Sequence, residues 1–226
     1  MRIRAPHLGI APRVALVAGG ALVAANLLLL VKPVGTLSAA FLASTLLMLV
    51  ACLVLALGLL GERGAFGSRA VSVLLIVSGA LGVAVVVVSP LGSVDPDVGP
   101  TLGYRAFSSV LLVADMARLF LLLMAAAVAG RSEGTQRDVR YGLRALALVA
   151  LAGFAIDNIL WSLLVTLIPA SGLTALFAVI EWLHRLNFLA GIAVGVWFAW
   201  PWLGPRLISL RAVVTRAYRR YVDSTP

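Results

Sequence analysis

The sequence has very few residues that could bind a metal ion or carry redox chemistry. Its single cysteine, Cys52, excludes disulfides, cysteine-based metal sites and thiol redox pairs within one chain. One of its two histidines, His7, lies in the basic N-terminal arm and the other, His184, in an apolar segment, so a bis-histidine haem between the helices is excluded. The HExxH motif of metalloproteases is also missing. We therefore expect no cofactor, no metal and no recognisable set of catalytic residues.

Charged residues are scarce as well. They make up 12% of the 226 residues against 62% hydrophobic residues, whereas about a quarter of a soluble domain is charged. Six apolar segments are long enough to cross about 30 Å of hydrocarbon as helices, at residues 14–31, 36–60, 70–91, 106–130, 145–168 and 173–200. The segments of alternating polarity that form a membrane barrel are absent. The sequence thus predicts an all-α membrane protein with six transmembrane helices in one bundle.

Basic charge comes almost entirely from arginine, and its placement predicts the orientation. Arginines precede the first predicted helix, flank the connection between the second and third helices and that between the fourth and fifth, and fill the C-terminal tail. The connections on the opposite side contain only Lys32 and Arg105. By the positive-inside rule, both termini are then cytoplasmic in a multi-pass protein of the cell membrane. The formal net charge of +9 is largely a consequence of this topology. Nucleic-acid binding is not expected, because the arginines are spread over several loops.

The chain divides into a transmembrane domain, residues 1–204, and a cationic tail, residues 205–226. Apolar residues recur at helical spacing in the tail, and most of its arginines fall off that stripe. We expect an amphipathic helix on the cytoplasmic leaflet, where each arginine contributes about 1 kcal/mol of attraction to anionic lipids. The candidate lipid-binding residues are Arg211, Arg216, Arg219 and Arg220. A solvated tail or a docking site for a cytoplasmic protein partner is the alternative.

Six ionisable residues lie inside the apolar segments of the second half of the chain. They are Asp115, Arg118, Asp157, Glu181, His184 and Arg185. A charge in the bilayer costs at least about 2.5 kcal/mol, so such residues normally pair, face the bundle interior or mark a functional site. At about 1.5 Å per residue, all six fall roughly 19 to 28 Å above the inner helix ends, with Asn26 at the same level.

The sequence therefore predicts one polar layer in the outer half of the bilayer, with Asn158 beside Asp157 as a further member. The helix at 70–91 is expected to stay outside this layer, because its valine-rich run at 83–88 suits a position facing lipid.

The layer contains three acids and two arginines, which leaves one surplus negative charge that His184 can balance. A carboxyl group or His184 is then expected to exchange a proton near neutral pH, as in a proton relay or a proton-coupled binding site. Arg118 and Arg185 are the candidate partners of Asp157 on other helices. Alternatively, Asp115–Arg118 and Glu181–Arg185 form local pairs that merely hold helices together. A divalent cation would be repelled by the two arginines.

These features predict a class of function but no substrate. A small secondary transporter, or a membrane subunit that binds a substrate, is expected first, with the polar layer as the site for a small molecule or a proton. A non-catalytic sensor or assembly subunit with a protein partner is the alternative. A lipid-modifying enzyme is the second alternative, and it lacks a recognisable nucleophile or metal site. The spacing of Gly191 and Gly195 favours packing between helices of one chain over a dimer interface.

Overall fold

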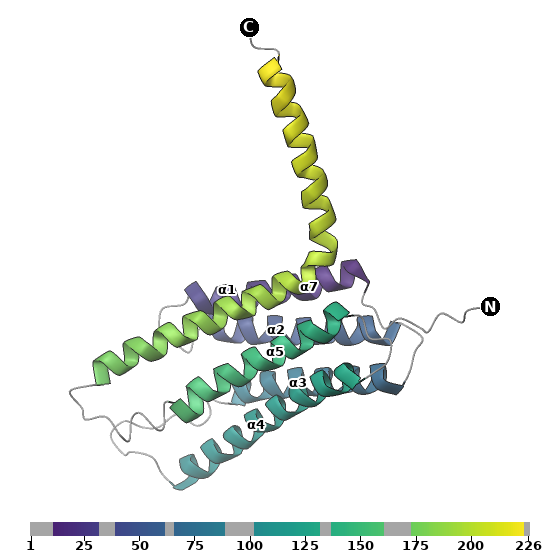
Figure 1. Ribbon diagram of the computed structural model, residues 1–226. Helices are drawn as coiled ribbons and strands as arrows, with labels where there is room; N and C mark the ends of the chain where they lie inside the picture. The colour runs from purple at the N-terminus through teal and green to yellow at the C-terminus, as the bar shows by residue number, and fades with distance from the viewer. Residues whose placement is uncertain are drawn as a thin grey trace.

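The computed structural model describes residues 11–31, 39–61, 66–88, 102–131, 137–160 and 173–223, and these residues are helical almost throughout. The elements are α1 (Pro12–Val31), α2 (Ala39–Gly61), α3 (Phe66–Val88), α4 (Leu102–Arg131), α5 (Arg137–Phe154), the π-helix η2 (Ala155–Leu160) and α7 (Leu173–Asp223) (Figure 1). Five of the helices are long and apolar enough to cross a membrane, and α3 contains a shorter apolar stretch, Arg69–Val85. The structure thus confirms a helical bundle suited to a membrane.

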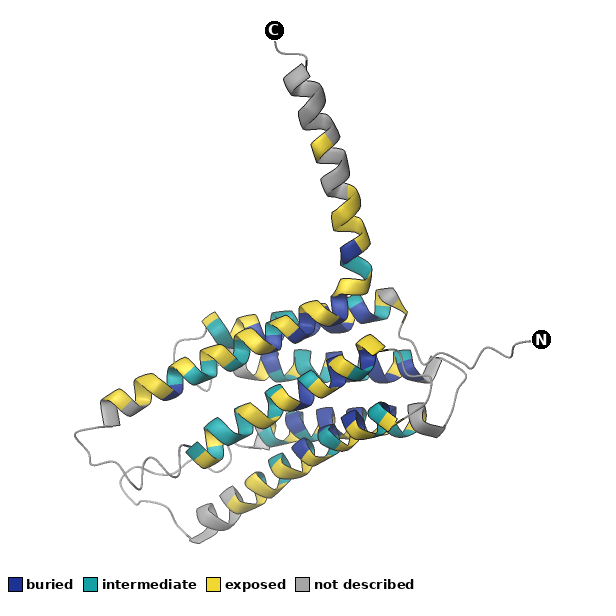
Figure 2. Ribbon diagram, in the orientation of Figure 1, coloured by how far each residue is buried: buried dark blue, intermediate teal, exposed yellow. Residues whose placement is uncertain are grey.

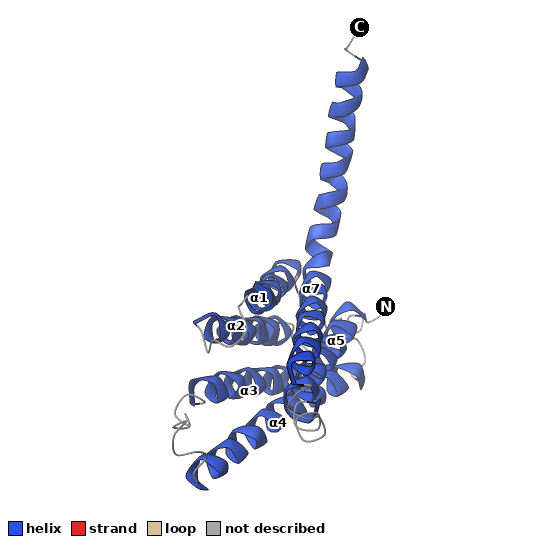
Figure 3. Ribbon diagram, turned by 90° about the vertical axis from the view of Figure 1, so that its left-hand side faces the viewer, coloured by secondary structure: helices blue, strands red, loops and turns tan. Residues whose placement is uncertain are grey.

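The helices close a ring in the order of the sequence. Each of the helices α1 to α5 packs against the next, and α7 packs against both α5 and α1. Figure 3 looks towards the helix ends and shows α1 to α4 following one another in an arc beside α5 and α7. We call the half that contains the start of α1, the end of α4 and the start of α5 the inner half, and the opposite half the outer half.

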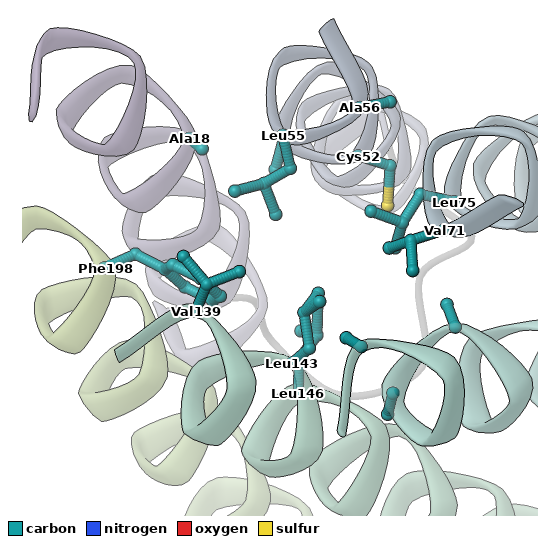
Figure 4. Packing of buried hydrophobic residues seen from close by; sticks show 14 of the residues in the cluster. Ala18, Cys52, Leu55, Ala56, Val71, Leu75, Val139, Leu143, Leu146 and Phe198 are labelled. Atoms are coloured by element: carbon teal, nitrogen blue, oxygen red, sulfur yellow. The ribbon is translucent and has the colours of Figure 1, made fainter. Parts of the chain in front are cut away.

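The apolar core lies in the inner half. All six helices contribute to it, with Leu22, Leu55, Leu75, Leu122, Leu143 and Phe198 among the buried residues (Figure 4). Phe198 lies against the backbone of Gly142, where an added Cβ would be 2.5 Å from the Phe198 ring. Figure 2 shows the buried residues gathered towards this end of the bundle and exposed residues dominating the other end of α4, α5 and α7.

Glycine allows α1 and α7 to approach closely. A Cβ at Gly195 would lie 2.7 Å from the carbonyl oxygen of Gly19 and 2.9 Å from the backbone nitrogen of Val23. Because these are backbone atoms, the two helices could not keep this separation with larger residues at the crossing. The paired glycines Gly191 and Gly195 therefore serve packing within the chain, as predicted.

The fifth helix differs from the prediction at both ends. It begins at Arg137 rather than at residue 145, and its α-helical part stops at Phe154, where η2 follows. Residues 161–172, which include the rest of the predicted segment, lie outside the described residues. The π-helix has no signal in the hydropathy pattern, and short π-helices are frequent at functional sites.

The last helix continues beyond the predicted end at residue 200 and extends to Asp223 with Pro201 and Pro205 inside it. Proline removes one helical hydrogen bond and bends a helix without always ending it. Figure 1 shows that the part after this proline pair leaves the bundle and runs across the direction of the other helices. The backbone of Arg211, Arg216, Arg219 and Arg220 belongs to this helical tail, and their side chains lie outside the described part of the structure.

Candidate functional site

The six ionisable residues form three pairs. Arg118 Nε lies 2.8 Å from Asp115 Oδ1 within α4, and Arg185 Nη2 lies 2.5 Å from Glu181 Oε1 within α7. The third pair joins two elements, because His184 Nε2 on α7 lies 2.7 Å from Asp157 Oδ1 on η2. The candidate partners of Asp157 were therefore wrong. Arg118 and Arg185 are each engaged by an acid on their own helix, at i,i+3 and i,i+4 spacing.

This pairing identifies which acid carries the surplus charge. The two arginine pairs are neutral, so the acid that remains is Asp157, and its partner is the only histidine among the six residues. With a neutral imidazole the Asp157–His184 pair carries one negative charge, and with a protonated imidazole it carries none. Histidine is the side chain whose charge ordinarily changes between pH 5 and 8. Among the three pairs, Asp157–His184 is therefore the one whose net charge depends on whether an imidazole is protonated.

The Asp115–Arg118 pair, which we call the α4 pair, lies against α3. The Arg118 side chain passes over Gly82, where an added Cβ would lie 3.1 Å from Arg118 Cδ. Ser78 Oγ donates a hydrogen bond of 3.0 Å to the carbonyl oxygen of Arg118. The prediction that the third helix stays outside the polar layer is wrong, because small residues that precede its valine-rich run make room for an arginine.

The other four ionisable residues are separate from the α4 pair. We call them the α7 cluster, and they are Asp157, Glu181, His184 and Arg185. Helix α4 packs against α3 and α5 but not against α7 or η2. Among the described residues, no hydrogen bond or ion pair joins the two groups. Figures 1 and 3 show the outer end of α4 standing away from α5 and α7. The single layer expected from helix depth is thus divided laterally into two sites.

The α7 cluster is accessible from outside the packed chain. The Asp157 side chain is 62% exposed, whereas that of His184 is 27% exposed. The His184 ring stacks on Phe188 at 6.1 Å between centroids, and the Arg185 guanidinium lies 5.7 Å from the Trp182 ring centroid. The imidazole is therefore held in place on one side, while its carboxylate partner faces the surroundings.

The predicted amides have different environments. Asn26 is buried, donates a hydrogen bond of 2.8 Å to the Leu22 carbonyl and lies with its amide group against Gly191. Asn158 donates a hydrogen bond of 3.2 Å to the carbonyl of Phe154, in the turn where α5 becomes η2. Asn158 therefore supports the backbone of the π-helix, and Asn26 lies at the contact between α1 and α7.

One polar residue of this region was missed by the sequence analysis. The Asn187 amide nitrogen lies 3.0 Å from the position of a Cβ at Gly153, so this side chain lies against α5. Asn187 lies one helical turn after His184, and this spacing in the sequence could have placed both side chains on the same face of the helix. A column of polar groups thus follows one stripe of α7. It consists of His184 and Asn187 of α7 and of the amide group of Asn26 from α1, which lies against Gly191. Towards the inner half the stripe continues as the buried apolar residues Val194 and Phe198.

Within the described residues, no group of three or more histidine, cysteine, aspartate or glutamate side chains is arranged to bind a metal ion. Neither a family model, nor a curated protein, nor a solved structure matches this chain. The function is therefore inferred from the geometry of the chain itself.

Proposed function

We propose that the protein is a small secondary transporter, or the membrane subunit that binds its substrate, and that Asp157–His184 is its proton-responsive element. The observation that carries this proposal is the pairing pattern. Both arginines of the region are neutralised locally, which leaves one acid with one histidine at a 2.7 Å contact between two elements. Intramembrane ionisable groups of this kind commonly serve proton relays and ion pathways.

The distribution of polarity along the bundle supports the same proposal. Asn26 and Ser44 are buried in the outer half and Ser78 is buried near the middle of α3, whereas in the inner half the described buried polar side chain is Ser72, which donates a hydrogen bond to the carbonyl of Ala56. A polar ligand that enters from the outer side would meet hydrogen-bonding groups and then stop at the apolar core.

The proposed orientation places both termini in the cytoplasm and the α7 cluster near the outer face of the cell membrane. The arginine-rich connections at the inner half favour it. The helical tail crosses the direction of the bundle helices, which is the arrangement needed for a helix lying along the cytoplasmic leaflet. Labelling of engineered cysteines on a Cys52→Ser background tests it: Ser93→Cys should react from outside, and Ser132→Cys only after permeabilisation. The reverse pattern would overturn the orientation.

Proton movement by the purified chain tests the transport proposal. The protein is reconstituted in liposomes with an entrapped pH-sensitive dye, and the decay of an imposed pH gradient is followed. We expect the wild-type chain to accelerate the decay, and Asp157→Asn or His184→Gln to abolish the acceleration. The double variant Glu181→Gln/Arg185→Gln is the matched control, because it removes both charges of a neutral pair in the same cluster and leaves the net charge of the cluster unchanged. A wild-type chain that leaves the gradient unchanged would contradict proton movement by this chain alone.

A second candidate, a sensor or assembly subunit, is favoured by the exposure of the α7 cluster. Trp182 is 65% exposed beside the Glu181–Arg185 pair, and a helix of a membrane partner protein could cover this surface. This function predicts no proton movement by the isolated chain. It also predicts that Trp182→Ala lowers the stability of a complex isolated in mild detergent without altering that of the isolated bundle. No described contact favours a lipid-modifying enzyme.

A further inference from the structure

The start of α5 carries arginines on one face. Arg137, Arg140 and Arg144 are spaced by three and four residues, so they follow one another along the helix, with Tyr141 between them. The opposite face of the same turns is buried in the core through Val139, Leu143 and Leu146. The arginine face is therefore directed away from the core.

The three arginines differ in what they contact. Arg144 lies against Gly130, where an added Cβ would be 2.7 Å from Arg144 Nη2. Gly130 belongs to the last turn of α4, and the free carbonyls of a helix end attract cations, so this arginine is engaged. The Arg137 guanidinium lies 5.6 Å from the ring centroid of Tyr141.

Arg140 has one nitrogen, Nε, whose hydrogen bond is not made by the described residues. Its Nε atom is buried and has no hydrogen-bond partner in the part of the chain that is described. A buried donor left unsatisfied costs about 1 to 3 kcal/mol, so such a group calls for an acceptor that the described residues do not supply. The acid in the first turn of α5, Asp138, lies off the arginine face by helical spacing, and its carbonyl oxygen accepts a hydrogen bond of 3.1 Å from Trp197 Nε1.

We propose that Arg137 and Arg140 bind the phosphate of an acidic phospholipid in the leaflet at the inner end of the bundle. Guanidinium groups bind phosphate oxygens through paired charge-assisted hydrogen bonds, and the exposed Arg137 and the half-buried Arg140 would offer their terminal nitrogens to one phosphate from successive turns of α5.

The same face of α5 fits the rest of a lipid molecule. One and two turns beyond Arg144, the helix presents Leu148, 62% exposed, and Leu151, 40% exposed. These residues continue the arginine face by helical spacing, so the headgroup and an acyl chain would lie along one continuous strip. The indole of Trp197, 48% exposed, lies at the start of this helix, and tryptophan is typical of the headgroup level. An apolar strip above the arginines favours a lipid over a soluble phosphate.

Native mass spectrometry of the full chain tests the site. The protein is released from nanodiscs containing phosphatidylcholine and phosphatidylglycerol, and the ratio of retained acidic to zwitterionic lipid is measured. Since one arginine near an anionic headgroup is worth about 1 kcal/mol, Arg137→Gln and Arg140→Gln should each lower this ratio about fivefold. Arg69→Gln is the matched control: it removes an exposed arginine at the same end of the bundle, on α3. It should leave the ratio unchanged.

Two results would overturn the site. An equal loss in the Arg69 variant would show that acidic lipid is attracted only by diffuse surface charge. Displacement of the lipid by millimolar inorganic phosphate would assign the site to a soluble anion. Should Arg140→Gln fail to fold, Arg140→Lys keeps the charge and removes the planar fork, and it should still lose part of the preference. Arg137 is exposed, so its replacement tests the site without disturbing the core.

Discussion

The inner and outer halves of the bundle are built in different ways. In the inner half, all six helices share one apolar core, and α1 and α7 touch through the backbones of Gly19 and Gly195. In the outer half, α4 stands apart, and the contact between η2 and α7 includes the polar Asp157–His184 pair. Tight packing gives stability and leaves little room to move, whereas few apolar contacts allow movement. The inner half therefore stabilises the fold, and under the proposed function the outer half is where a ligand would bind.

The largest effect on stability is expected from the inner core. Leu143 is 1% exposed, and Leu143→Ala should lower the free energy of unfolding by about 2 to 5 kcal/mol, because it leaves a cavity among helices that cannot collapse further. Leu186→Ala is the control in the outer half, since Leu186 is 57% exposed and leaves no cavity. Thermal unfolding in detergent measures both. Equal losses would show that the two halves are equally packed.

The close approach of α1 and α7 gives a second test. Gly19→Ala places a Cβ 2.8 Å from the backbone nitrogen of Ala199, and overpacking of this kind costs about 1 to 3 kcal/mol. Its neighbour is the matched control, because a Cβ at Gly20 meets nothing within 4 Å. Gly20→Ala should leave the melting temperature unchanged or raise it through its higher helix propensity. A stable Gly19→Ala variant would contradict the backbone contact.

In the outer half, activity and stability should separate. Asp157→Asn and His184→Gln are each expected to abolish proton movement while lowering stability by less than about 1 kcal/mol, because the Asp157 side chain of the pair is 62% exposed. If both variants lose stability in proportion to the activity that they lose, the pair instead serves to hold η2 against α7. That result would favour an assembly subunit.

The smallest effect is expected from the local pair on α7. Glu181→Gln or Arg185→Gln should change stability by about 0.3 to 0.5 kcal/mol, the usual value for an i,i+4 pair on a helix surface. A double-mutant cycle of the two changes measures the coupling. A coupling of several kcal/mol would mean that this pair is desolvated by lipid or by a partner protein. Coverage by a partner protein would favour the sensor or assembly subunit over the transporter.

Hydropathy along the chain was enough to predict a helical membrane protein and to locate the ionisable residues of the candidate site. Each apolar segment must satisfy its own backbone hydrogen bonds in lipid, so hydropathy along the chain is enough to locate the helices. Hydropathy also located the six ionisable residues, because a charged residue interrupts an apolar segment. They are Asp115, Arg118, Asp157, Glu181, His184 and Arg185. The surplus acid also followed from counting charges.

How these residues pair depends on the arrangement of the helices in the folded chain. Depth in the bilayer follows from position along one helix, but neighbours depend on the order of helices around the ring, which separates α4 from α7. That order brings Asp157 to His184, and it gives α3 the room for Arg118 that its valine-rich run did not suggest. The π-helix at Asp157 and the long bent α7 were likewise absent from the hydropathy pattern. Hydropathy is a property of single segments, whereas pairing and packing arise between segments, and this is why the fold class was predictable and the site was not.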